Sequence, residues 1–197
     1  MKSIDVKGTA RTETGKKACR DIRKAGAVPF NLYGEAKDEK GLPVALSFTA
    51  TQEELRKLVY SPDIYSVNLN IDGKECKAIM KELQFHPVTD RLLHVDFYEI
   101  TETKPIVMEV PIKLNGLAEG VRAGGKLAAS VRKLKVRAPY TAIPEQLNID
   151  VTNLGLGKTI KVGELSFEGL EMVTSPSVVV CQVKMTRSAM SAAAKAE

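Results

Sequence analysis

The stretch IYSVNLNIDGKECKAIMKELQF, residues 64–85, decides the fold. Apolar and polar side chains alternate in both halves of it, and this period of two residues is typical of β-strands with one buried face. The pair Asp72-Gly73 separates the halves, and Asp-Gly is the preferred sequence of the tight turn that joins two antiparallel strands. We therefore predict a β-hairpin with strands from Ile64 to Ile71 and from Lys74 to Phe85.

Similar patterns on both sides extend the hairpin into a mostly antiparallel domain that ends near residue 100. Further strands are predicted from Ile4 to Arg11, Val28 to Tyr33, Val44 to Thr49 and Leu92 to Ile100.

Two short helices are predicted between these strands. The first runs from Lys16 to Lys24, with Gly26 just beyond its end, where a left-handed residue commonly terminates a helix. The second runs from Gln52 to Val59. Thr51 and Glu54 have the spacing of a capping box at its start, and a proline follows its end.

A second, all-β domain is predicted at residues 101–187, after the aperiodic linker TETKP. Its strand patterns are IVMEVPIKL, VRKLKVRA, LNIDV, TIKV and VVVCQVKM, separated by glycine-rich and proline-rich turns. The alanine-rich end SAMSAAAKAE, residues 188–197, lacks a wide apolar face, and we predict a disordered tail there. The predicted fold class is thus mainly β.

Composition limits the class of protein. The chain has 197 residues, 44% of them hydrophobic and 27% charged, which is typical of a folded soluble protein. No stretch approaches the roughly 18 apolar residues of a membrane span, so we expect no membrane association and a location in the cytoplasm. Cys19, Cys76 and Cys181 are scattered and odd in number, which favours reduced thiols.

Positive charge is concentrated at the beginning of the chain. Residues 1–24 carry eight lysines and arginines against three acids, a local excess equal to the net charge of +5 of the whole chain. On the first predicted helix Lys16, Arg20 and Arg23 are spaced by four and three residues and so share one face. A cationic face of this kind suits the phosphates of a nucleic acid.

A second group of cations lies in the predicted second domain, in the segment VRKLKVR, residues 131–137. Its charged members are Arg132, Lys133, Lys135 and Arg137. Lysine and arginine are common on the solvent face and the edges of sheets, so we interpret this group as ordinary charged decoration of a strand.

Motifs typical of enzymes and metal sites are incomplete. Gly120 to Lys126 has the glycine and lysine spacing of a phosphate-binding loop, but Leu127 stands where the magnesium-binding Ser or Thr belongs, and a strand pattern follows. The two histidines, His86 and His94, lack further ligands at metal-binding spacing. We predict no enzymatic activity, cofactor, metal or small-molecule substrate; an enzyme using this loop would instead bind ATP, which calorimetry tests.

Two later strands are predicted to carry polar groups on the face opposite the core. The predicted core face comprises Ile79, Leu83, Phe85, Leu93, Val95 and Phe97, and the opposite face comprises Gln84, His86, His94, Asp96 and Tyr98. Such donors and acceptors suit the base edges and riboses of a nucleic acid. A polar network that merely covers the sheet is the alternative.

Two signatures decide between these readings. The run ARTETGKKACRDIRKAGAVPFNLYG, residues 10–34, resembles the start of bacterial large-subunit ribosomal protein number twenty-five, the family of the general stress protein Ctc. The run KELQFHPVTDRLLHVDFYEI, residues 81–100, matches the second signature of that family, Q-x-H-P followed by H-x-D-F. Three downstream segments, residues 110–127, 136–151 and 154–165, look like the second domain of its longer members.

The resemblance implies a small N-terminal β-barrel with short helices that binds the loop E region of 5S ribosomal RNA within the large subunit. The implied RNA-contacting residues are Arg11, Lys16, Arg20, Arg23, Tyr33, Gln84, His86, His94 and Asp96. Neighbouring ribosomal proteins are further possible partners. A stress-linked interaction module, whose second domain recruits a protein, is the alternative function.

The chain departs from the family pattern in the first predicted helix. Asp21 stands where many members have an arginine, Lys17 where many have a glycine, and Cys19 where many have a serine. Lys81 also breaks the alternation of its strand, which requires a bulge if the strand is continuous.

Overall fold

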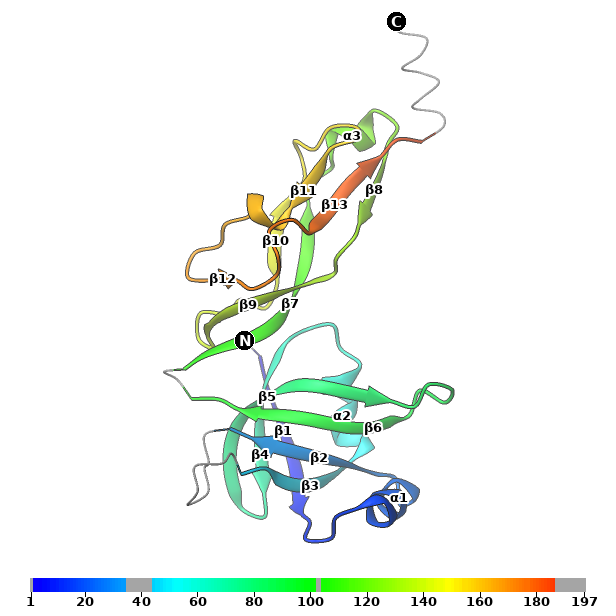
Figure 1. The fold of residues 1–197 in the computed structure, drawn as a ribbon, viewed down its shortest axis with the longest axis vertical. Helices are drawn as coiled ribbons and strands as arrows, with labels where there is room; N and C mark the ends of the chain where they lie inside the picture. Colours follow the sequence, from blue (N-terminus) through cyan, green and yellow to red (C-terminus); the bar gives the residue numbers. More distant parts are fainter. Residues whose placement is uncertain (1, 35–43, 102–103, 187–197) are drawn as a thin grey trace, which may run out of the picture. The chain divides into compact units, whose positions relative to one another are not determined.

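The structure, a computed structural model, describes residues 2–34, 44–101 and 104–186. Strands dominate, which confirms the prediction of a mainly β protein (Figure 1). The chain forms two units, Met1–Lys104 and Pro105–Glu197. The predicted tail at residues 188–197 lies outside the described residues.

Six strands of the first unit close into a barrel in the order β1-β3-β2-β6-β5-β4. They are β1 (Lys2–Ala10), β2 (Ala27–Tyr33), β3 (Leu46–Thr51), β4 (Tyr65–Ile71), β5 (Lys74–Phe85) and β6 (Leu92–Glu99). Four neighbouring pairs are antiparallel, whereas β1 with β4 and β2 with β6 are parallel. Closure leaves none of these strands as a free sheet edge.

Three phenylalanine rings occupy the centre of the barrel. Phe30 lies 5.4 Å from Phe48 and 5.3 Å from Phe97, measured between ring centroids, and all three are at most 2% exposed. A Cβ at Gly8 would come within 2.9 Å of the Phe30 ring, so the glycine of β1 makes room for it. Burial of one such side chain stabilises a fold by about 1.5–3 kcal/mol.

The hairpin predicted at Asp72-Gly73 is present between β4 and β5. Asp72 and Gly73 have φ values of 47° and 87°, the positive angles that a type I′ turn requires. The carboxylate of Asp72 also accepts a hydrogen bond from the backbone amide of Ala10 at 3.0 Å. The turn therefore also fastens the end of β1.

The two helices of the first unit, α1 (Lys16–Lys24) and α2 (Gln52–Val59), have the predicted bounds. Gly26, at φ 81°, follows α1 as expected. The predicted capping box is wrong, because the side chain of Thr51 makes no capping hydrogen bond. Thr51 is also the last residue of β3, where its pairing with Ala27 constrains its orientation.

The second unit consists of two small sheets, in the orders β10-β7-β9-β12 and β11-β13-β8. Its strands are β7 (Pro105–Asn115), β8 (Lys126–Ala129), β9 (Lys133–Pro139), β10 (Leu147–Asp150), β11 (Thr159–Lys161), β12 (Glu171–Met172) and β13 (Val179–Lys184), with the short helices α3 (Glu119–Arg122) and η1 (Val162–Glu164). The strand β12 and both short helices lack a predicted counterpart, whereas β8 corresponds to the strand pattern that follows the glycine-rich segment.

In the VRKLKVR segment, Lys133, Lys135 and Arg137 lie on the solvent face of β9, whose residues alternate between exposed and buried, and Arg132 is exposed just before the strand. Lys135 Nζ lies 3.8 Å from Glu109 Oε1, and Arg137 Nη1 lies 3.8 Å from Glu171 Oε2. Exposed pairs of this kind contribute little stability. The interpretation as strand decoration fits this arrangement.

Candidate nucleic-acid interface

The outer face of β6 carries a histidine and an aspartate one above the other. Val95 and Phe97 are fully buried on the inner face, so His94 and Asp96 face outward. His94 Nδ1 lies 3.4 Å from Asp96 Oδ1, and the two side chains are 17% and 22% exposed. The pair is therefore partly buried but remains accessible to a binding partner.

The strands on either side of β6 extend this polar face. On β5, Gln84 pairs with His94 and Glu82 pairs with Asp96. On β2, Asn31 pairs with Asp96, and its amide oxygen accepts a hydrogen bond from the Ser47 hydroxyl at 3.0 Å. Three adjacent strands thus present donors and acceptors together.

Two tyrosines complete the face on β2 and β6. The rings of Tyr33 and Tyr98 lie 5.8 Å apart, nearly perpendicular at 69°. Burial raises the pKa of Tyr33, and the negative charges of Asp96 and Glu82 raise it further. The phenol therefore stays protonated at neutral pH and is available as a hydrogen-bond donor.

Burial favours the neutral form of His94. Burial lowers the pKa of His94 foremost; Asp96 opposes this shift, whereas the cations Arg11 and Arg23 add to it. A neutral imidazole has one donor and one acceptor, which suits the recognition of hydrogen-bonding groups better than the attraction of phosphate.

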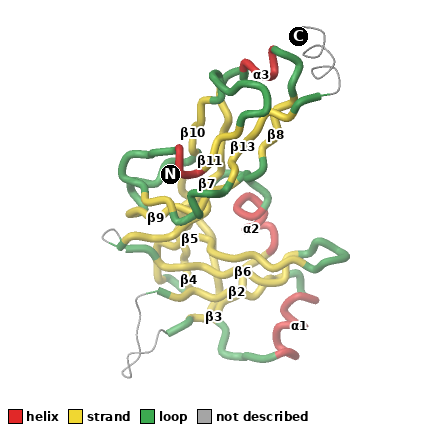
Figure 2. The backbone as a smooth tube through the Cα atoms, turned by 45° about the horizontal axis from the view of Figure 1, so that its top comes forward, coloured by secondary structure: helices red, strands yellow, loops and turns green. Residues whose placement is uncertain are grey.

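The helix α1 brings cations beside this face. Figure 2 shows α1 on the outside of the barrel wall. Arg23 Nε donates to the backbone oxygen of Leu93 at 3.1 Å, which joins the last turn of α1 to β6. Lys16 and Arg20 are exposed on the same helix.

Arg11 lies between β1 and α1 and is half-buried. Its Nη1 donates to the Cys19 sulfur at 3.2 Å. Its Nε is buried and has no hydrogen-bond partner among the described residues. A buried donor without a partner costs free energy.

His86 has a structural role in the turn between β5 and β6. Its Nδ1 accepts hydrogen bonds from the backbone amides of Val88 and Thr89, each at 3.3 Å. Its own amide donates to the Arg91 oxygen at 2.8 Å. The ring is thus locked in place, and only its Nε2 edge is available to a partner.

A bulge in β5 corrects part of the predicted core. The pairing with β6 shifts between Met80 and Glu82, so Lys81 is the extra residue. Ala78 belongs to the barrel core, whereas Ile79 is buried, as predicted, but lies outside that cluster. The prediction that Phe85 is buried is wrong, since it is 40% exposed after a second shift of register.

The neighbouring strand needs a smaller correction. Leu92 is buried at 4% exposure, whereas Leu93, predicted to be core, is only half-buried. Strict alternation cannot reveal such shifts because a bulge changes the face of every residue that follows it.

The glycine-rich segment from Gly120 to Lys126 cannot cradle phosphate as folded. The backbone amides of residues 119–125 all donate to backbone oxygens of the second unit. A Cβ at Gly120 would come within 2.6 Å of the backbone of Gly155, which explains this glycine by close packing. A phosphate-binding loop needs free backbone amides, so the role of this segment is structural.

The described residues contain no group of three His, Cys, Asp or Glu side chains that could hold a metal ion. Within the same part of the chain, no helix is long and apolar enough to cross a membrane.

Comparison with known proteins identifies the family. Residues 6–97 match the Ribosomal L25p family, and residues 105–187 match the C-terminal domain of ribosomal protein TL5. The protein named large ribosomal subunit protein bL25 from Phocaeicola vulgatus is 65% identical over 196 residues, spanning 100% of this chain and 99% of the relative. The chain belongs to the ribosomal L25p family.

Other ribosomal L25p proteins match equally completely. The protein of the same name from Bacteroides thetaiotaomicron is 58% identical over 201 residues, which cover 100% of this chain and 99% of that relative. The one from Porphyromonas gingivalis is 53% identical over 196 residues, covering 99% of both. The resemblance inferred from the two signatures is confirmed, and a ribosomal L25p protein is a structural protein rather than an enzyme.

The polar face of this ribosomal L25p protein contains residues that the sequence analysis missed. Asn31 and Glu82 lie directly beside Asp96 in the sheet. Both obey the period of two, since Asn31 has the parity of Tyr33, and Glu82 that of Gln84. The alternation of the sequence therefore placed both residues on the polar face, but only the strand pairing showed that they lie beside Asp96.

Proposed function

We propose that this constituent of the large ribosomal subunit binds 5S ribosomal RNA through its first unit, in the cytoplasm and as part of the ribosome. Its support is the half-sheltered polar face on β2, β5 and β6, joined to a cationic helix by the hydrogen bond from Arg23 to Leu93. Family membership makes ribosomal RNA the natural ligand of such a surface.

The cations serve to position the protein on the RNA backbone. The proposed phosphate contacts are Arg11, Lys16, Arg20 and Arg23. The bond to Leu93 uses one of the five N–H donors of the Arg23 guanidinium, so four remain for phosphate oxygens or a base edge. Charge contacts of this kind supply affinity and carry little sequence information.

The polar face serves to recognise the shape of the RNA. The proposed recognition residues are Tyr33, Gln84, His86, His94 and Asp96. Tyr33 donates, Asp96 accepts, and Gln84 and the neutral His94 do both, so the face can match a mixed set of base edges and ribose hydroxyls. Neighbouring ribosomal proteins are further partners of the assembled chain.

A salt titration of the full chain with 5S ribosomal RNA tests the proposal, with transfer RNA as competitor. We expect tight binding that survives the competitor. Release of counterions from about four phosphates gives a log–log slope of affinity against salt of roughly −3 to −4, if the duplex DNA coefficient is applied. Weak binding that transfer RNA abolishes equally would mean that the basic segment is a non-specific polycation.

A further inference from the structure

Two aromatic side chains of the first unit are exposed in contact with each other. Tyr60 is 57% exposed and Phe85 is 40% exposed. Their ring centroids lie 6.3 Å apart at an angle of 52°. Tyr60 follows the end of α2, and Phe85 ends β5. Neighbouring exposed aromatic rings indicate an interaction site on the protein surface.

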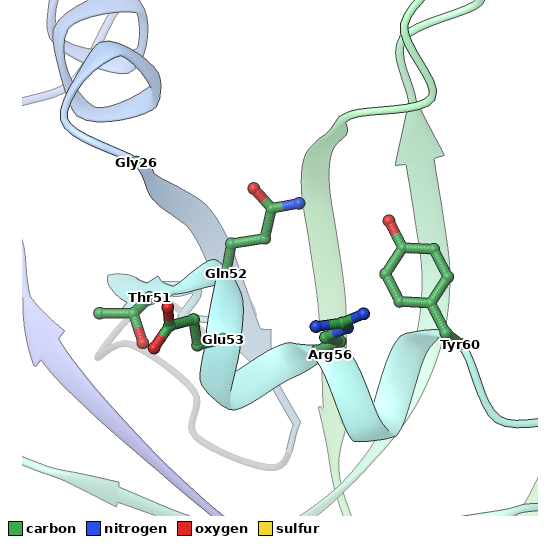
Figure 3. A pocket seen from close by; sticks show the side chains of 6 residues that line it. All are labelled: Gly26, Thr51, Gln52, Glu53, Arg56 and Tyr60. Atoms are coloured by element: carbon green, nitrogen blue, oxygen red, sulfur yellow. The ribbon is translucent and has the colours of Figure 1, made fainter.

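An open hollow lies beside Tyr60, along α2. Gln52, Arg56 and Tyr60 line it at intervals of four residues, so they follow one face of the helix (Figure 3). Thr51, Glu53 and Gly26 complete the lining. Its volume of about 820 Å³ lies within the range of about 300–1,000 Å³ that is usual for small-ligand sites.

The lining suits a nucleobase better than a phosphate. Proteins hold unstacked bases between aromatic rings or arginine planes, with amide groups on the base edges. Tyr60, Arg56 and Gln52 provide these three kinds of group. Glu53 in the same lining offsets the charge of Arg56, so the hollow has no excess of positive charge to attract phosphate.

Residues of the aromatic pair and of the hollow are close in sequence to the RNA interface proposed above. Phe85 stands between Gln84 and His86 in the chain, and both belong to that interface. Gly26, on the far side of the hollow, comes two residues after the end of α1 (Figure 3). A peptide cannot add a strand to this unit because the barrel is closed.

We propose that Tyr60, Phe85 and Arg56 hold one unstacked nucleobase of the RNA that the first unit binds. This inference rests on the proposed function and adds to it a site for a single extruded nucleotide. The base stacks on the aromatic pair, and the Arg56 guanidinium covers it.

Binding of the full chain to 5S ribosomal RNA tests the site with matched variants. Tyr60→Leu removes the ring while keeping apolar bulk, and it lowers affinity about 5- to 150-fold, the usual effect of losing one stacked base. Tyr60→Phe keeps the ring and retains the affinity of the original chain. Tyr140→Leu removes a partly exposed tyrosine of the second unit and serves as the matched control, with unchanged affinity.

Ultraviolet cross-linking of the same complex supplies an independent readout. A nucleotide adduct is expected on Tyr60 or Phe85, detected by mass spectrometry of tryptic peptides; the peptide ELQFHPVTDR contains Phe85 as its only Phe, Tyr or Trp. If the original chain binds 5S ribosomal RNA but Tyr60→Leu binds equally well, the nucleobase site is wrong while the proposed function stands. Failure of the original chain to bind would remove both.

Discussion

At the residue scale, three side chains of the interface also make hydrogen bonds within the fold. Arg23 bridges α1 to β6, His86 organises a turn, and Arg11 donates to Cys19. Each therefore presents its remaining donors in a defined orientation, which would reduce the entropic cost of the proposed RNA binding. The consequence is that some substitutions here will affect both stability and affinity.

His94 makes stability depend on pH. Burial lowers its pKa below the ordinary value of 6.5, so the unfolded chain takes up a proton at a higher pH than the folded protein does. The contribution of the neutral imidazole is therefore complete above about pH 6.5 and declines as the pH falls below it.

Urea denaturation measures this effect in the original chain and in His94→Asn. On going from about pH 7.5 to about pH 5.5, we expect the free energy of unfolding to fall more in the original chain, because the variant lacks the titrating imidazole. His86→Asn, which changes the other histidine, serves as the control. Equal losses in the original chain and His94→Asn would show that burial of His94 does not influence stability.

At the element scale, α1 and the barrel strands are suited to different tasks. The helix has no buried residue, and its sequence KKACRDIRK is dominated by charge. The strands β5 and β6 instead present a partly sheltered mixture of polar groups on one face. These surroundings suit the tasks that we propose, long-range attraction of RNA by the helix and short-range recognition by the strands.

Substitution on the two elements should separate these tasks. Arg20→Ala is expected to weaken 5S ribosomal RNA binding and to flatten the salt slope by about one unit, since one phosphate contact is lost. Asp96→Asn is expected to leave the slope unchanged and to reduce discrimination against transfer RNA. The same salt titration measures both, with Lys77→Ala, an exposed lysine of β5 that is not among the proposed contact residues, as the charge-matched control for Arg20→Ala.

An identical change of slope in Arg20→Ala and Asp96→Asn would contradict the division. So would an equal effect of Lys77→Ala, because the helix would then contribute only through the net charge of the chain.

At the scale of the whole molecule, the chain contains two units with separate hydrogen-bonded sheets. All the residues of the candidate interface, including the nucleobase hollow, belong to the first unit. The barrel is closed on itself and has its own aromatic core, so it has what a domain needs to fold alone.

Truncation tests this independence. A fragment of residues 1–104 is expected to fold, with a far-ultraviolet circular dichroism spectrum typical of β structure. It is also expected to bind 5S ribosomal RNA with the affinity of the full chain. The salt titration compares the two. A fragment that folds but binds much more weakly would show that residues 105–197 contribute to the interface.

Local chemistry allowed much of this architecture to be predicted from the sequence. The Asp72-Gly73 turn, the bounds of α1 and α2 and the long strand β5 depend on interactions between residues close in the chain. The cationic face of α1 follows from helical spacing alone. The two family signatures, near the two ends of the first unit, assigned residues of both to one interface without any knowledge of strand pairing.

Only the tertiary structure decided which strands are neighbours and where the alternation changes face. The parallel pairing of β2 with β6 brings Asn31 to Asp96, and the bulge at Lys81 moves Ile79 out of the barrel core. The contact of Tyr60 with Phe85 joins the residue that follows α2 to the last residue of β5. These features depend on barrel closure and register, which are properties of all the strands together, whereas propensity and spacing act over a few residues at a time.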